Sequence, residues 1–187
     1  VERIKDMIYN NQIDNLCIVA QFKSEINYTD ESGNVTVAAR SDKDLIIVKS
    51  NLSGIVNDTA IYINSVQNSV LKQINRSNDN GYYLSGDLFG TMFFDDTHSI
   101  SGNSDATADV LVIKVNQNLD FLWARKGGGL GYDHVNSTES DKYGNIYITG
   151  KIEGTVTFDS TASLMSSSIE GLGGQDLYLL KYNKQGT

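Results

Sequence analysis

The chain has 187 residues, 40% hydrophobic and 20% charged, which is enough apolar material for a folded core and too much for a disordered chain. Its net charge of −8 excludes the basic surface that non-specific nucleic-acid binding needs, and it opposes docking on anionic lipid. No apolar run reaches the ~18 residues of a membrane-spanning helix, and no signal peptide is recognisable. Because the chain begins with Val, we expect a processed product or an excised segment.

Proline is absent, so turns must rest on Gly, Asn, Asp and Ser. They occur in "DESGN" at 30–34, "SNDNG" at 77–81, "SDKYGN" at 140–145 and "NKQG" at 183–186. Short runs rich in Val, Ile, Leu and Tyr lie between these turns. This pattern predicts many short strands joined by tight connections.

The first predicted elements are "IKDMIYN" near the start, whose spacing fits a helix or a strand, and the apolar run "NLCIVA" that ends at Ala20. Cys17 lies inside this run, so we expect a buried, inert thiol rather than a reactive one. Asp44 then begins the run "DLIIVKSNLSG". The segment "TAIYINS" at 59–65 is the next predicted strand.

The second set of elements begins with "SVQNSVLKQINRS", which again fits a helix or a strand. Its position before "YYLSG", a strand predicted to end at Gly86, favours strand, and the same argument applies to "IKDMIYN". The segment "DLFGTMFF" follows, then a second Asp-led run, "DVLVIKVNQNL", from Asp109. The segment "FLWARKGGG" at 121–129, which contains Trp123, is predicted as a further strand.

The third set begins with "HVNSTES" at 134–140, predicted as a strand. In "DKYGNIYITG", Asp141, Gly144 and Asn145 are expected to form a hairpin turn, and Gly150 is expected to end the strand that follows. The segment "KIEGTVTF" at 151–158 matches "DLFGTMFF". A third Asp-led run, "DLYLLKYNKQG", starts at Asp176.

The three Asp-led runs start 65 and 67 residues apart, and each has Asp, four apolar residues, Lys, one residue and Asn. We therefore predict three repeat units of about four strands, at 1–65, 66–129 and 130–187. Four short strands repeated at a fixed period are typical of β-propeller blades, which bury their faces against each other. The predicted fold class is all-β, a β-propeller-type repeat with about three four-stranded antiparallel blades.

The third unit resembles the SBBP (seven-bladed β-propeller) repeat of bacterial surface and secreted proteins. That pattern has a Gly-Gly entry, an Asp, a "D-x-x-GN-x-Y-x-x-G" turn and strand, and a "G-x-D" that leads to a "K-x-(N/D)-x-x-G" end. The matching positions are Gly127–Gly131, Asp133, Asp141, Gly144, Asn145, Tyr147, Gly150, Phe158, Gly174, Asp176, Lys181 and Gly186, with Trp123 matching the Trp strand of the preceding unit. The second unit matches more loosely, and the first lacks both glycines.

The resemblance implies a non-enzymatic scaffold or interaction module, secreted or at the cell surface, that acts in display, assembly or adhesion. It implies protein partners or further copies of the chain, and it supplies no catalytic residue or cofactor. Propellers typically have four to eight blades, so three units leave three alternatives: a fragment of a larger propeller, a ring completed by several chains, or an open stack. A carbohydrate- or calcium-binding, lectin-like propeller is the alternative function.

Candidate chemistry is sparse. Asp79 and Asp141 lie in turns that could offer oxygen ligands to calcium, but Asp side chains more often cap their own turns. His98 and His134 have no second histidine at metal spacing, so we expect solvated or turn positions. The glycine runs "GGGLG" at 127–131 and "GLGG" at 171–174 are interpreted as entry turns rather than phosphate loops.

The aspartates that open the three runs, Asp44, Asp109 and Asp176, are expected to hydrogen-bond neighbouring backbone. A position that recurs in every unit suggests a structural role, since a catalytic acid would occur once.

Overall fold

The computed structural model describes residues 3–40, 43–64, 69–159 and 167–187. The protein is all-β, as predicted, and none of these residues lies in a helix. Within the same residues there is accordingly no helix of the length and apolarity needed to cross a membrane.

The strands follow the repeat. The first unit contributes β1 (Arg3–Asn10), β2 (Asn15–Phe22), β5 (Asp44–Asn51) and β6 (Val56–Asn64); the second contributes β7 (Val70–Arg76), β8 (Tyr82–Leu88), β11 (Asp109–Val115) and β12 (Phe121–Gly128); the third contributes β13 (His134–Ser140), β14 (Ile146–Phe158) and β15 (Ser167–Tyr182). In each unit these strands pair antiparallel in chain order. The first two units thus have four paired strands each, and the third has three. Both ambiguous segments, β1 and β7, are strands, and residues 65–68 of the second lie outside the described residues.

A hairpin follows the second strand of the first two units. The first hairpin joins β3 (Glu25–Asp30) and β4 (Gly33–Ala38), and the second joins β9 (Thr91–Phe93) and β10 (Ser99–Ser101). In the third unit β14 and β15 themselves extend to form the same feature. The chain between the second strand and the Asp-led strand is therefore folded back as strand rather than being a polar loop.

The glycines that were expected to end strands lie within them instead. Strand β8 runs through Gly86 to Leu88, and β14 runs through Gly150 to Phe158. Both glycines face a β-bulge in the first strand of their unit, at Leu71/Gln73 and at Val135/Ser137. A Cβ at Gly86 would collide with the Val70 carbonyl oxygen, and one at Gly150 would collide with the His134 carbonyl oxygen. Glycine is thus needed because the bulged neighbour approaches closely.

Each Asp-led strand ends in the same turn. The Asn51 side-chain oxygen accepts the backbone N–H groups of Ser53 and Ile55 at 2.9 and 3.0 Å. Asn116 and Asn183 do the same two and four residues further on, at 2.8–3.1 Å. The fourth residue of each turn has a positive φ: 81° at Gly54, 66° at Leu119 and 79° at Gly186. The recurring Asn therefore shapes the turn by capping it, and the turn keeps its conformation even where a leucine replaces glycine.

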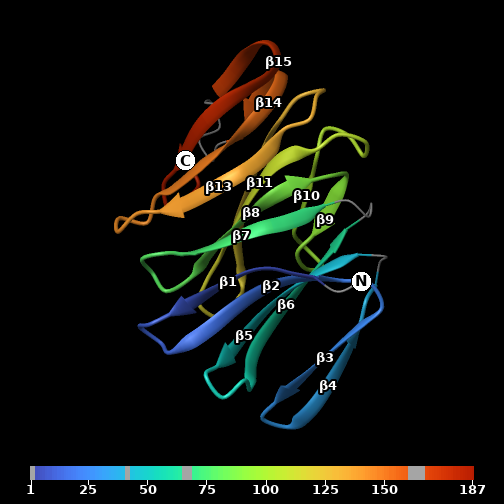
Figure 1. Ribbon diagram of the computed structural model, residues 1–187, viewed down its shortest axis with the longest axis vertical. Helices are drawn as coiled ribbons and strands as arrows, with labels where there is room; N and C mark the ends of the chain where they lie inside the picture. Colours follow the sequence, from blue (N-terminus) through green and yellow to red (C-terminus); the bar gives the residue numbers. More distant parts are fainter. Residues whose placement is uncertain (1–2, 41–42, 65–68, 160–166) are drawn as a thin grey trace.

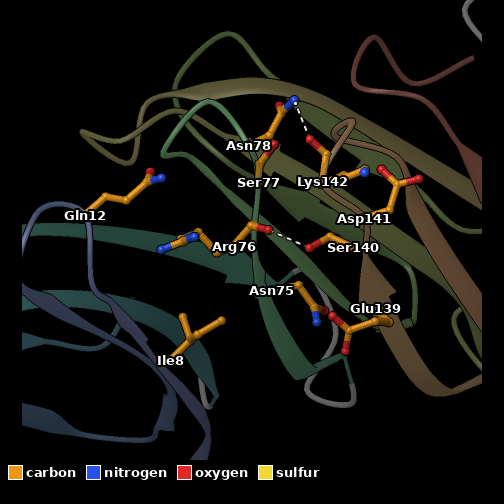
Figure 2. A pocket seen from close by; sticks show the side chains of 10 residues that line it. All are labelled: Ile8, Gln12, Asn75, Arg76, Ser77, Asn78, Glu139, Ser140, Asp141 and Lys142. Carbon is orange, nitrogen blue, oxygen red and sulfur yellow. Dashed lines mark hydrogen bonds between the residues drawn. The ribbon is translucent and has the colours of Figure 1, made fainter.

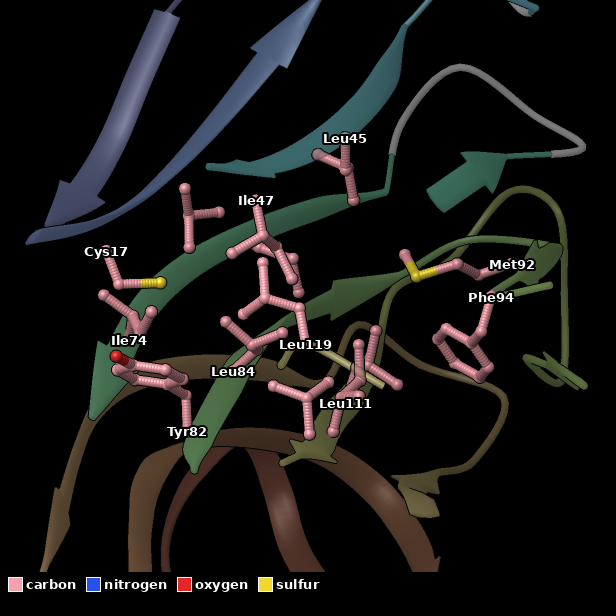
Figure 3. Packing of buried hydrophobic residues seen from close by; sticks show 14 of the residues in the cluster. Cys17, Leu45, Ile47, Ile74, Tyr82, Leu84, Met92, Phe94, Leu111 and Leu119 are labelled. Atoms are coloured by element: carbon pink, nitrogen blue, oxygen red, sulfur yellow. The ribbon is translucent and has the colours of Figure 1, made fainter. Parts of the chain in front are cut away.

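The three units stack along the long axis of the molecule, and the β3–β4 hairpin lies beyond the first unit (Figure 1). The largest hydrophobic cluster lies between the first two units, where Leu45 and Ile47 pack with Leu71, Ile74 and residues of β8 and β11 (Figure 3). A second cluster joins Val110 and Val112 of the second unit to β13, β14 and β15. Each of these two clusters draws residues from two units, so most of the core lies between units. A smaller third cluster, formed by Ala20, Phe22 and Ile46, packs against the β3–β4 hairpin within the first unit.

Backbone pairing crosses the same interfaces. The fourth strand of the first unit, β6, pairs with β9 of the second, through Ile63↔Phe93 and Asn64↔Met92. The fourth strand of the second unit, β12, pairs with β14 of the third, through Gly127↔Phe158 and Gly128↔Thr157. The two junctions are built alike.

Candidate functional site

A polar pocket lies where the first strands of the three units, β1, β7 and β13, end side by side (Figure 2). It has a volume of about 540 Å³ and a polar lining drawn from β1, β7, β13 and the turns after them. Its charged groups are Arg76, Glu139, Asp141 and Lys142, and Gln12 and Asn78 add amides. All three units contribute, so the pocket exists only in the stack.

Strands β7 and β13 are held together by side chains that reach across to backbone. Asn75 Nδ2 donates to the Thr138 carbonyl at 3.2 Å, and Thr138 Oγ1 donates to Asn75 Oδ1 at 2.6 Å. Ser140 Oγ donates to the Arg76 carbonyl at 2.6 Å (Figure 2). These bonds fix the floor of the pocket without a backbone ladder between the two strands.

Strand β1 is joined to β7 in a similar way. Arg76 Nη1 donates to Asn10 Oδ1 at 3.2 Å and to Asn11 Oδ1 at 2.5 Å, and the Ile74 N–H donates to Asp6 Oδ2 at 2.9 Å. The guanidinium of Arg76 therefore bridges the first unit to the pocket wall. Both acceptors are neutral, and none of the described acidic side chains forms an ion pair with Arg76.

The predicted turn at Asp141 is confirmed and forms one rim of the pocket. The Asp141 carboxylate accepts from Asn145 Nδ2 at 2.7 Å and from the N–H groups of Asn145 and Tyr143 at 2.9 Å. These donors, the Asn145 side chain first, lower the pKa of Asp141 to about 2. Gly144, with φ 84°, passes close to Asn78 of the preceding unit's turn, and its carbonyl accepts from Tyr83 Oη at 2.6 Å.

The pocket can offer hydrogen bonds to a polar ligand from a cation, amides and carboxylates within one cleft. Among the described residues there is no cluster of three or more His, Cys, Asp or Glu side chains that could hold a metal ion. Asp79 and Asp141 are not brought together as ligands. Asp79 pairs with Lys114 Nζ at 2.6 Å and accepts from the Gly81 N–H at 3.1 Å, so each aspartate caps its own turn.

The recurring aspartates bond backbone, as their repetition suggested. The Oδ2 atoms of Asp44, Asp109 and Asp176 accept the N–H groups of Arg40, Asn103 and Leu172 at 2.6, 2.5 and 2.8 Å. Each carboxylate ties the end of the preceding loop to the start of its strand. Asp109 is fully buried, and desolvation raises its pKa to about 6.

Trp123 lies on β12 and contacts the third unit. Its Nε1 donates to the Lys184 carbonyl at 3.0 Å, and the Arg125 guanidinium lies 5.4 Å from its ring. At the equivalent place in the preceding junction, Lys49 Nζ donates to the Gln117 carbonyl at 2.7 Å. The capped Asn turn of one unit is thus held by the unit before it in both junctions.

The two histidines differ from each other. His98 is exposed in a turn, as expected, with its Nδ1 2.8 Å from Asp95 Oδ2. His134 was expected at a solvated or turn position, and that is wrong: it lies on β13, half-buried, with Nδ1 2.9 Å from Asp87 Oδ2. Asp87 also pairs with Lys72 at 2.7 Å and accepts the Val135 N–H at 3.1 Å. His134 therefore belongs to a polar cluster at the junction between the second and third units.

The remaining sequence features have structural roles. Cys17 is buried, and desolvation raises the pKa of its thiol to about 12, which suppresses thiolate chemistry. The "GGGLG" run leads into strand β13 and not a helix, as expected. The "GLGG" run at 171–174 is part of β15 and not an entry turn, because β14 and β15 extend beyond the Asp-led segment as one hairpin.

The pocket residues were not found from the sequence. Arg76 and Ser140 both immediately precede a hairpin turn in successive units, and this shared position is the only local signal. The contacts that make the site join residues about 64 positions apart, which strand patterns do not reveal. No protein-family model matches the sequence, and no curated protein matches it.

Proposed function

We propose that this protein is a non-enzymatic structural and interaction module, built of β-propeller-type repeats, that acts in assembly, surface display or adhesion outside the cell. The three stacked units are its blades in this proposal. The extracellular setting follows from the resemblance to repeats of bacterial surface and secreted proteins. The protein partners are recruited through the ends of the stack.

One observation carries the proposal: the last unit has an open face. On the face of each unit that points to the next one, β5, β11 and β15 carry apolar residues at two matching positions. Leu45 and Ile47 in the first unit, and Val110 and Val112 in the second, are at most 1% exposed. Their counterparts Leu177 and Leu179 are 82% and 70% exposed. Exposed apolar patches of this kind mark interaction surfaces.

The recurring residues support the same reading. The Asp of each run bonds a loop N–H, the Asn of each run caps a turn, and the glycines accommodate bulges. Every repeated position is therefore occupied with holding a unit or joining it to its neighbour. That is the pattern of a scaffold rather than of a catalyst.

The test is to supply the missing neighbour covalently. A second copy of residues 56–129, appended after Thr187, would provide a fourth strand beside β15 and a further unit against Leu177 and Leu179. We expect a higher unfolding temperature, lower binding of a hydrophobic dye and slower hydrogen exchange in 177–182. Unchanged exchange in 177–182, with the added unit folded, would refute the assembly face.

A second candidate is a carbohydrate-binding, lectin-like role, with or without calcium. The pocket of Figure 2 favours it, because Gln12, Asn75 and Asn78 place amides beside Arg76 and Glu139 in an open, polar cleft. Glycan-array binding that is lost in Arg76→Ala would support this role. Loss of binding on chelation would add calcium to it, and an array without signal would exclude it.

A further inference from the structure

The open face of the third unit has a counterpart at the other end of the same chain. In the first strand of each unit, two residues face the preceding unit. In the second unit these are Leu71 and Ile74, and in the third they are Val135 and Thr138; all four are at most 6% exposed. The register places Ile4 and Met7 at the same positions of the first unit. They are 69% and 61% exposed.

The two open ends therefore match the two halves of a junction that the protein already builds twice. In the first junction, Leu45 and Ile47 pack in one cluster with Leu71 and Ile74 (Figure 3). Leu177 and Leu179 occupy the places of the first pair, and Ile4 and Met7 occupy the places of the second. The β3–β4 hairpin packs on part of the outward face of the first unit, as β9–β10 packs at the equivalent face of the second, and it leaves Ile4 and Met7 exposed.

We propose that a second copy of this chain occupies the open face, head to tail, with Ile4 and Met7 of one copy packed on Leu177 and Leu179 of the other. This deepens the proposed function by naming the partner, and it rests on that function. A head-to-tail contact is heterologous, so it either closes into a ring or extends as a filament.

A capped turn adds a polar contact to the same interface. Lys49 holds the Gln117 carbonyl of the following unit at 2.7 Å, and Lys181 is the matching lysine of the third unit. The carbonyl that corresponds to Gln117 in the first unit is that of Leu52, whose side chain is also exposed. Lys181 of one copy is thus placed to donate to the Leu52 carbonyl of the other.

One position works against the contact and sharpens the test. Asp87 of the second unit accepts His134 Nδ1 and the Val135 N–H across the junction. Lys151 matches Asp87 in the third unit, and Arg3 matches His134 in the first. Head-to-tail docking therefore brings two cations together, and like charges across an interface weaken it. Substituting Lys151→Asp removes the repulsion and restores the acid of the internal junction.

The experiment measures the mass of the full chain by light scattering and sedimentation across a concentration series. We expect a species of twice the 20.5 kDa chain mass. Leu179→Asp should abolish it, whereas the matched control Leu130→Asp, at an exposed position outside β13, β14 and β15, should leave it unchanged. Lys151→Asp should tighten dimerisation about tenfold. A monomer at every concentration, for both the natural chain and Lys151→Asp, would overturn the proposal.

Orientation is tested with two single-cysteine variants and a short bismaleimide crosslinker, since Cys17 is buried. A mixture of Met7→Cys and Leu179→Cys should crosslink, and neither variant should crosslink with itself. Self-crosslinking of Leu179→Cys alone would overturn the head-to-tail arrangement. If the chain stays monomeric while the appended unit described above covers Leu177 and Leu179, the second copy is refuted and the assembly face stands.

Discussion

The burial of Asp109 gives a sharp test of the repeat's internal chemistry. Its carboxylate accepts the Asn103 N–H at 2.5 Å, yet it is fully buried, and desolvation raises its pKa from 3.8 to about 6. A carboxyl whose pKa is higher in the folded state holds its proton more tightly when folded. Its contribution to stability is complete below about pH 4 and is lost as the pH rises through about 6. The difference of about two units corresponds to at most ~3 kcal/mol.

Asp109→Asn removes this titration and keeps an oxygen for the Asn103 N–H. We expect the free energy of unfolding of the variant, minus that of the natural protein, to rise by up to ~3 kcal/mol between pH 4 and pH 6.5. Urea unfolding at half-unit pH steps measures it, and the difference between the two proteins cancels the titration of groups that do not interact with Asp109. Asp176→Asn, at the matching but only half-buried position, is the control and should change the free energy of unfolding less. A difference that stays flat or falls with pH would refute the reasoning.

Three further predictions concern the junctions. Gly150→Ala forces a Cβ against the His134 carbonyl and the Tyr178 ring, and we expect a loss of at least ~2 kcal/mol in urea unfolding, whereas Gly102→Ala, whose nearest contact would be 3.1 Å away, should cost under ~1 kcal/mol. Trp123→Phe removes the hydrogen bond to the third unit's turn, so hydrogen exchange in 183–187 should quicken and stability should fall by ~1–2 kcal/mol; unchanged exchange there would contradict the contact. Asp79→Asn removes the negative charge that compensates Lys114, which is 1% exposed, and should cost ~2–3 kcal/mol. Most of this loss should be recovered by adding Lys114→Met; no recovery in the double variant would show that the ion pair itself stabilises the fold.

The strands were largely readable from the sequence because the repeat multiplies each weak signal. The segment "SVQNSVLKQINRS" fits a helix or a strand when considered alone, but its position before "YYLSG" favours a strand, and β7 confirms this for its described part. The Asp-led runs were found for the same reason. Local patterns fail where a backbone contact decides the outcome: Gly150 looks like a strand end, but it lies mid-strand because a bulge in β13 approaches it.

The candidate site was not readable. Arg76 and Glu139 reach one pocket only after two units have stacked, and neither has a motif around it. His134 also depends on packing, since its partner Asp87 comes from the preceding unit. Interfaces between repeats are set by residues that differ from copy to copy. The repeat pattern, which relies on what the copies share, does not capture them.

The hydrophobic clusters that span two units each have a consequence for folding. The middle unit's Leu71 and Ile74 are buried by the first unit, and its Val110 and Val112 are buried by the third. Cutting the chain between two units would expose the hydrophobic residues that the two units bury against each other, so no single unit should stay folded alone in water. The chain should unfold in one cooperative step that begins at an end, where the third unit is sealed on one side only, and proteases should nick there first.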